Sequence, residues 1–88
     1  MANENNQQSF RGSQHAAMKE AFKGKEKLFI TVRPGFYNTA VQLSGSPEAR
    51  ESGVREVKIH VVENQTEDVI LHDDFQTMTD FINEKETK

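Results

Sequence analysis

Apolar and polar residues alternate along the middle of the chain, from Lys27 to His72. A pattern with a period of two is typical of β-strands that bury one face and expose the other. Four segments show this pattern, and turn-forming residues separate them. The segments are residues 27–33, 37–43, 55–63 and 67–72. The sequence therefore predicts a four-stranded sheet.

Two further segments have the spacing of amphipathic helices, one on each side of the predicted strands. In residues 13–23, Met18 and Phe22 lie four positions apart, and Gly24 follows where a helix commonly ends. The second helix begins at Asp73, whose side chain is suited to cap it. The apolar residues of this helix form one stripe, made of Phe75, Met78, Phe81 and Ile82.

The short connections predict that consecutive strands pair in an antiparallel way. Pro34-Gly35 makes a turn after the first strand, and residues 64–66 form a tight loop between the third and the fourth. In this register, alternate aliphatic residues of all four strands share an inner face, whereas Val62 and Ile70 lie on the outer face. We expect the C-terminal helix to cover that inner face, and the N-terminal helix is one candidate cover for the outer face.

We therefore expect an α+β fold: a small, four-stranded, mainly antiparallel sheet with an N-terminal helix and a C-terminal helix packed on it, in the order α-β-β-β-β-α. Residues 14–88 would form a single domain. Residues 1–13 are rich in Asn, Gln, Ser and Gly, and we expect them to be a disordered tail. Within the connector at residues 44–53, Ser46 and Pro47 predict one helical turn; otherwise this connector is a mobile loop.

The composition limits both the core and the location of the protein. Only 34% of the residues are apolar, so we expect a thin core that a partner or self-association would help to complete. The chain has no cysteine, which excludes disulfides and thiolate zinc sites. We find neither a secretory signal nor an apolar run long enough to span a membrane, and we expect a cytoplasmic protein without a membrane partner.

The net charge of −3 conceals an asymmetry along the chain. Residues 1–50 contain seven Lys or Arg and four Asp or Glu, a balance of +3. Residues 51–88 contain four Lys or Arg and ten Asp or Glu, a balance of −6. One interpretation is an ordinary solvated surface. The other is a bipolar molecule that attracts acidic partners at one end or associates with itself.

No group of residues carries the pattern of an active site. His60 and His72 are diagonal neighbours in the expected register, but two ligands are too few for a stable metal site. Asp73 and Asp74 are explained by helix capping. The serines lie in the tail and the connector, and the glycines are scattered singly. We therefore expect no enzymatic activity, no cofactor, no metal and no small-molecule substrate.

The most distinctive candidate for function is the outer face of the predicted sheet together with the turn after its first strand. Aromatic and basic side chains gather there, and these residue types are common in binding interfaces. The candidate binding residues are Lys27, Phe29, Arg33, Phe36, Tyr37, Lys58 and His60. Phe36 and Tyr37 would be anchors, and Arg33 would contact a carboxylate or a phosphate. Strand parity alternatively places Tyr37 in the core.

Two functions follow from this surface. The first is a small, non-enzymatic interaction protein that binds or occludes a macromolecular partner, with a protein partner, a homodimer or both. The alternative is a single-stranded nucleic-acid-binding module, in which bases stack on aromatic rings and cations hold the backbone. The low isoelectric point, near 5.6, argues against strongly charge-driven nucleic-acid binding. The apolar residues of the outer face, Phe29, Val62 and Ile70, are equally typical of a sheet that a helix or a second subunit covers.

Overall fold

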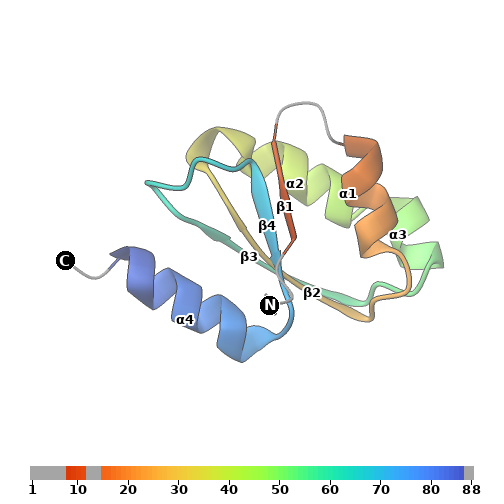
Figure 1. The fold of residues 1–88 in the computed structure, drawn as a ribbon. Helices are drawn as coiled ribbons and strands as arrows, with labels where there is room; N and C mark the ends of the chain where they lie inside the picture. Colours follow the sequence, from red (N-terminus) through yellow and green to blue (C-terminus); the bar gives the residue numbers. More distant parts are fainter. Residues whose placement is uncertain (1–7, 12–14, 87–88) are drawn as a thin grey trace.

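The computed structural model describes residues 8–11 and 15–86. Its elements, in chain order, are β1 (Gln8–Phe10), α1 (His15–Phe22), β2 (Lys27–Val32), the 3-10 helix η1 (Pro34–Phe36), α2 (Tyr37–Ser44), α3 (Pro47–Glu51), β3 (Glu56–Val61), β4 (Val69–His72) and α4 (Phe75–Glu86) (Figure 1). The predicted α+β class is confirmed, with a four-stranded mixed sheet and more helices than the two expected.

The strands lie in the order β1-β4-β2-β3. Strand β4 is antiparallel to both β1 and β2, whereas β3 is parallel to β2. A parallel pair needs a crossover connection, because the chain must return to the same end of the sheet. Here η1, α2 and α3 make that crossover between β2 and β3. The mixed sheet is thus a direct consequence of helices in the stretch between residues 34 and 51.

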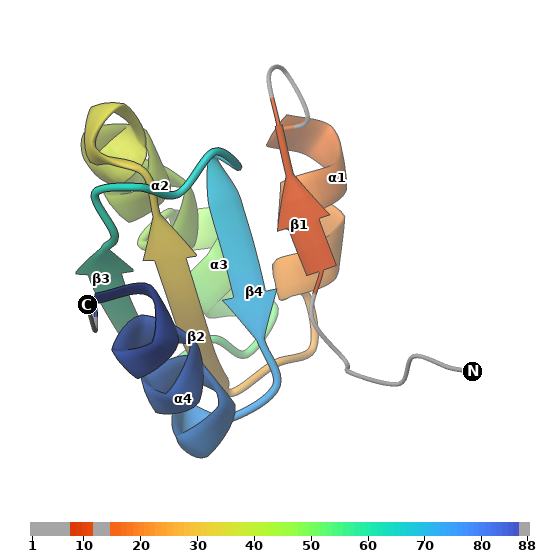
Figure 2. The ribbon, with the colours of Figure 1, turned by 60° about the vertical axis from the view of Figure 1, so that its left-hand side comes forward.

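Helices cover both faces of the sheet. In Figure 2, α4 lies in front of one face, and the other three α-helices lie behind the other. The face toward α1, α2 and α3 is aliphatic: Ile30 stands between Leu71 of β4 and Ile59 of β3. Met18 and Phe22 of α1 complete this core and are almost fully buried. The opposite face, toward α4, carries a mixture of aromatic, polar and basic side chains.

The prediction of a strand at residues 37–43 is wrong, because this segment is the helix α2. The polar–apolar alternation competes there with helical spacing, since Phe36, Ala40 and Leu43 follow one another at intervals of four and three. Ala40 is fully buried and lets the helix approach the sheet closely. Tyr37 is 43% exposed, so the alternative that placed it in the core is also wrong. Packing of a helical face has outweighed β-propensity.

The fourth strand is β1, within the stretch expected to be a disordered tail. Phe10 is buried and pairs with Val69 of β4, and the Asp68 amide donates to the Phe10 carbonyl at 2.9 Å. Burial of Phe10 and the antiparallel ladder with β4 together attach this three-residue strand to the sheet edge. Residues 1–7 and 12–13 of the expected tail lie outside the described residues.

The predicted hairpin between the third and fourth strands is also wrong. Strand β2 lies between β3 and β4, and the connection passes the end of β2. Gln65 stabilises this passage, because its side-chain amide donates to the carbonyls of Thr31 and Glu67 at 3.0 and 2.9 Å. The predicted faces are nevertheless correct: Ile59 of β3 and Leu71 of β4 lie on the same side as Ile30, and Ile70 lies on the opposite side.

The two terminal helices cover the faces opposite to those expected. The N-terminal helix α1 packs on the aliphatic face, and α4 packs on the other face. Met78 of α4 is buried, and the Phe81 ring lies 5.0 Å from the His72 ring. With α1, α2 and α3 already covering the aliphatic face, the C-terminal helix packs on the opposite one. Its predicted apolar stripe is buried only in part, because Phe75 stays 56% exposed.

Two helix starts test the capping predictions. The helical turn predicted after Ser46 is confirmed as α3, since the Ser46 hydroxyl accepts the Ala49 amide at 3.2 Å. At α4 the cap is Asp74 rather than the predicted Asp73, because the Asp74 carboxylate accepts the Thr77 amide at 2.8 Å. This hydrogen bond lowers the pKa of Asp74.

Candidate interaction surface

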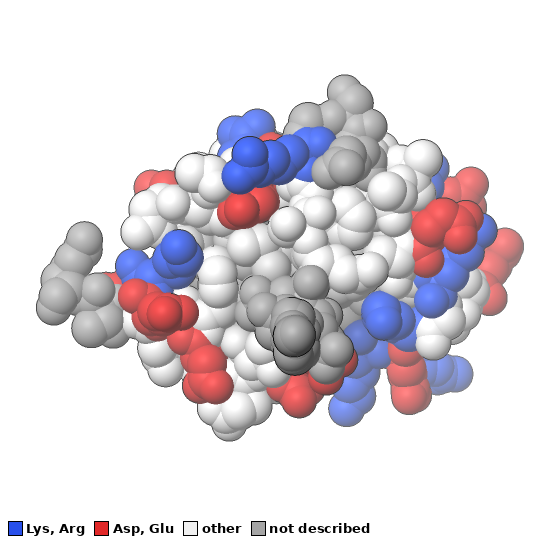
Figure 3. All heavy atoms as spheres, in the orientation of Figure 1, with Lys and Arg blue, Asp and Glu red and all other residues white. Residues whose placement is uncertain are grey.

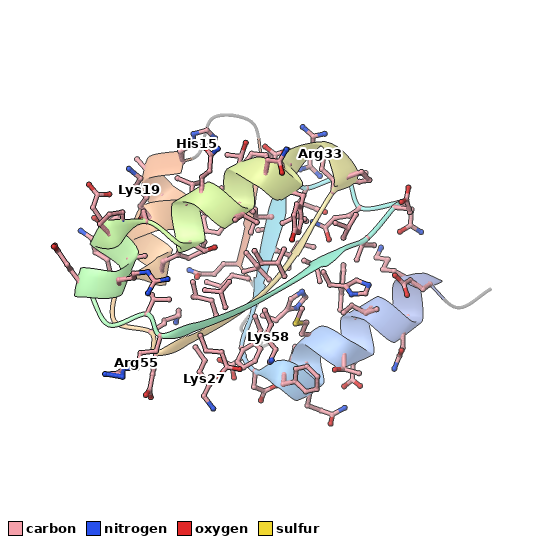
Figure 4. The ribbon with its side chains drawn as sticks, turned by 180° about the vertical axis from the view of Figure 1, so that it is seen from behind. His15, Lys19, Lys27, Arg33, Arg55 and Lys58 are labelled. Carbon is pink, nitrogen blue, oxygen red and sulfur yellow. The ribbon has the colours of Figure 1, made fainter. Side chains whose placement is uncertain are left out.

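The structure divides the seven predicted binding residues into two groups. Lys27, Phe29, Lys58 and His60 lie on the α4 side of β2 and β3, where Phe29 is paired in register with Lys58. Arg33, Phe36 and Tyr37 lie at the far end of β2 and the start of α2. Figure 4 shows this separation, with Lys27 and Lys58 toward one end of the sheet and Arg33 at the other. The seven residues therefore do not form one surface.

The first group does not form an open platform, because α4 lies against it. Phe29 is half-buried, and its ring lies 6.1 Å from the ring of Phe75. Lys58 pairs with Glu56 at 3.2 Å. His60 Nε2 lies 3.0 Å from a carboxylate oxygen of Glu86, near the end of α4. The expected outer face is thus covered by a helix of the same chain, although by the C-terminal helix.

The second group offers a single accessible anchor. Phe36 is only 7% exposed and belongs to the core. Arg33 Nε donates to Asp68 Oδ1 at 2.5 Å, so this guanidinium already has a carboxylate partner. Tyr37 remains exposed at the start of α2. Of the three residues predicted at the turn, Tyr37 alone presents a largely free aromatic side chain.

The two strand histidines are separated by β2, where His60 is paired in register with Thr31 and His72 with Phe29. His72 is 3% exposed, and its Nε2 lies 3.0 Å from the Thr31 hydroxyl. Burial lowers the pKa of His72 to about 4. No three His, Asp or Glu side chains within residues 8–11 and 15–86 are arranged to hold a metal ion.

The surface that the sequence prediction did not find is the outer edge of β3. Among the described strands, none pairs with this edge. The amides of Glu56 and Val62 donate to carbonyls at the two ends of β2, Glu26 and Val32. Because main-chain bonding alternates along a parallel ladder, the groups of Val57, Ile59 and Val61 point the other way. These three alternate residues therefore offer their N–H and C=O groups to a partner.

A hollow with a mixed lining adjoins this edge. It has a volume of about 280 Å³ and lies between α2 and the first half of β3, with Val41, Val57 and Ile59 in its lining. Val41 is 41% exposed, and the two strand residues are half-buried. Ser44, Arg50 and Arg55 contribute polar groups to the same lining. The edge thus combines free main-chain groups with a place for apolar side chains. In Figure 4, β3 crosses the front of the molecule, with α2 and α4 on either side.

A larger hollow, of about 370 Å³, lies between α1 and α3. The charged residues in its lining already pair with one another: Lys19 with Glu48 at 3.3 Å, and Lys23 with Glu20 at 3.0 Å. Such paired charges give little preference for a ligand of either sign. We therefore regard the β3 edge as the stronger candidate.

The sequence contained only part of the signal for this edge. It predicted β3 itself, as residues 55–63, and it singled out Lys58 and His60 on that strand. However, the predicted hairpin placed the fourth strand against β3 and closed its edge. The helical spacing of Phe36, Ala40 and Leu43 was the usable signal, because a helical crossover makes β3 parallel to β2 and no longer requires the hairpin.

Charge is mixed over the face drawn in Figure 3. Basic and acidic side chains alternate around its rim, and the centre carries few of either. This face does not show the separation into a basic and an acidic end that the sequence asymmetry suggested.

No helix in the described part of the chain is long and apolar enough to cross a membrane.

Comparisons with protein-family models, with curated proteins and with solved structures found no match for this chain.

Proposed function

We propose that the protein is a non-enzymatic protein-interaction module that binds an extended segment of a partner along the free edge of β3. The observation that carries this proposal is the edge itself: Val57, Ile59 and Val61 direct their main-chain groups outward, beside a hollow that has aliphatic side chains in its lining. An added strand would obtain affinity from main-chain hydrogen bonds. It would obtain specificity from the alternate side chains that enter the hollow.

The two edges of the sheet differ in how well they suit this role. Strand β1 has three residues, and short edge strands discourage pairing with other chains. Strand β3 has six, long enough for a regular ladder. Its one lysine, Lys58, is the kind of residue that protects edges, but it lies on the α4 side and is paired with Glu56. The α2 side of the edge is aliphatic.

Single-stranded nucleic-acid binding has weaker support. The stacking residue Phe29 is half-buried beside Phe75, so a base would reach its ring only after α4 moved. Lys58 and Arg33 already have carboxylate partners. Fluorescence anisotropy with labelled oligonucleotides tests this alternative. About three phosphate contacts would give a log–log salt slope near −2, whereas strand addition predicts no binding of this kind.

Selection from a library of displayed random peptides tests strand addition without knowledge of the natural partner. We expect the wild-type protein to enrich peptides with apolar residues at alternate positions. Ile59→Pro removes one outward amide, and proline is tolerated on an edge strand where its N–H would face solvent. The enriched peptides should therefore lose binding to this variant.

Phe75→Ala is the matched control, because it removes an exposed aromatic side chain on the α4 side of the sheet, opposite to the hollow. If Ile59→Pro lacks the wild-type circular dichroism spectrum, Ile59→Lys replaces it, since this change keeps the backbone amide and adds a charge beside the hollow. The proposal fails if no such peptides are enriched, or if those enriched bind the folded edge variant as well as the wild type.

A further inference from the structure

We propose that the strand bound at this edge is β3 of a second copy of the chain, so that two sheets join into one continuous sheet. The inference rests on the proposed function and names its partner. In a dimer with a two-fold axis perpendicular to the sheet, the two β3 strands run antiparallel. The same edge then serves both copies, and no second type of surface is required.

The hydrogen-bonding directions favour one register. In an antiparallel ladder, hydrogen-bonded residue pairs exchange both of their main-chain bonds. A pairing centred on Ile59 places Ile59 opposite its copy and Val57 opposite Val61. The main-chain N–H and C=O groups of these three residues all point toward the free edge. This register overlaps nearly the whole of β3 with its copy.

Neighbouring registers are less favourable. A two-fold axis one residue earlier would place Lys58 directly opposite Lys58, in the closely spaced kind of antiparallel pair. An axis one residue later would place His60 opposite His60 and shorten the overlap. Like charges in directly opposed positions destabilise a sheet. The register centred on Ile59 instead places Lys58 opposite His60, whose imidazole lies 3.0 Å from Glu86.

Charges at the ends of β3 also complement one another in this register. Arg55 precedes the strand and Glu63 follows it, and both side chains are exposed. Antiparallel pairing about Ile59 brings Arg55 of each copy to Glu63 of the other, so the dimer contains this pair twice. In this register Val61 of the second copy lies opposite Val57, one of the aliphatic residues that line the hollow. Charge and apolar contact thus favour the same arrangement.

Exchanging the end charges tests the register. By sedimentation equilibrium, we expect the wild type to show a reversible monomer–dimer equilibrium. Arg55→Glu alone and Glu63→Arg alone each replace two attractive pairs by two repulsive ones, which should weaken the dimer about tenfold. Mixing these two variants should restore wild-type affinity, because both end pairs of the mixed dimer again join an acidic side chain to a basic one. Lys25→Glu, an exposed charge change before β2, is the matched control.

Recovery on mixing separates a direct contact from damage to the fold, since two damaged chains would not repair each other. The inference is overturned if the wild type stays monomeric at all accessible concentrations, or if the mixture is as weak as each variant alone. A monomeric chain that still binds selected peptides at β3 would leave the proposed function standing. One combined result would overturn both the inference and the proposed function. In that result, neither Ile59→Pro nor the charge exchange weakens the dimer, and no selected peptide binds at β3.

Discussion

His72 is a titratable side chain enclosed between the sheet and α4. Its Nε2 atom lies 3.0 Å from the Thr31 hydroxyl, and its ring lies 5.0 Å from that of Phe81. Its other ring nitrogen, Nδ1, has no hydrogen-bond partner in the described part of the molecule. Burial holds the pKa at about 4, so the imidazole is neutral at physiological pH. A charge here would be surrounded by groups that cannot solvate it.

This burial predicts a loss of stability in mild acid. The unfolded chain binds a proton at His72 near pH 6.5, whereas the folded chain does so only near its lowered pKa of about 4. As the pH falls between these values, the unfolded state binds more protons, so the free energy of unfolding decreases. The full loss is roughly 3 kcal/mol for a shift of this size. Urea unfolding measured between these two pH values should show it.

His72→Gln is the control, since it keeps a polar side chain that does not titrate. Lowered carboxylate pKa values, as for Glu67 and Asp74, act at lower pH, so the range from about pH 5 to 6.5 separates histidine from these carboxylates. The difference between the wild type and His72→Gln in this range then gives the contribution of His72. Equal pH dependence in the variant and the wild type would contradict this account of His72.

At the level of elements, the sequence correctly predicted the positions of most strands and helices and the faces of the strands, because these depend on local residue pattern. The strands β2, β3 and β4 and the helices α1 and α4 all occur at the expected places, and the strand faces are as expected. Pairing was not predictable in the same way, because a period of two defines a face and does not identify a neighbour. The segment at residues 37–43 fits both periods, and only packing against the sheet decides between them.

The helical state of α2 has a measurable consequence at Gln42, an exposed position of that helix. Valine has a lower helix propensity than alanine, so Gln42→Val should be less stable than Gln42→Ala by about 0.5 kcal/mol. Chemical unfolding of the two variants measures this difference. The opposite order, with valine more stable, is what a strand at residues 37–43 would give.

At the scale of the whole molecule, the binding surface emerges from the sheet order. Lys58 and His60 were singled out from the sequence for their place on an outer face, yet α4 covers much of that face. The apolar residues of the same strand were assigned entirely to the core. Their half-exposed state follows from the position of β3 at the end of the sheet. The local residue pattern cannot predict that β3 lies at the edge of the sheet, because the strand order depends on which strands pair.

The location of Phe36 is a second feature that the local residue pattern could not predict. Its aromatic side chain and its place after a turn made it a reasonable anchor, but it lies in the core with α2. Tyr37, the next residue, is exposed because a helix turns successive side chains by about 100°. The distinction between anchor and core therefore depended on whether a helix or a strand follows residue 36.

The most direct test of strand addition at β3 is amide hydrogen exchange, followed residue by residue by NMR at increasing protein concentration. In the monomer, Lys58 and His60 should exchange slowly because their amides face β2, whereas Val57, Ile59 and Val61 should exchange fast. As the concentration rises, these three amides should become protected while those of Tyr37 and Gln42 stay unchanged. Fast exchange at all three positions in a sample shown to be dimeric would contradict pairing through this edge.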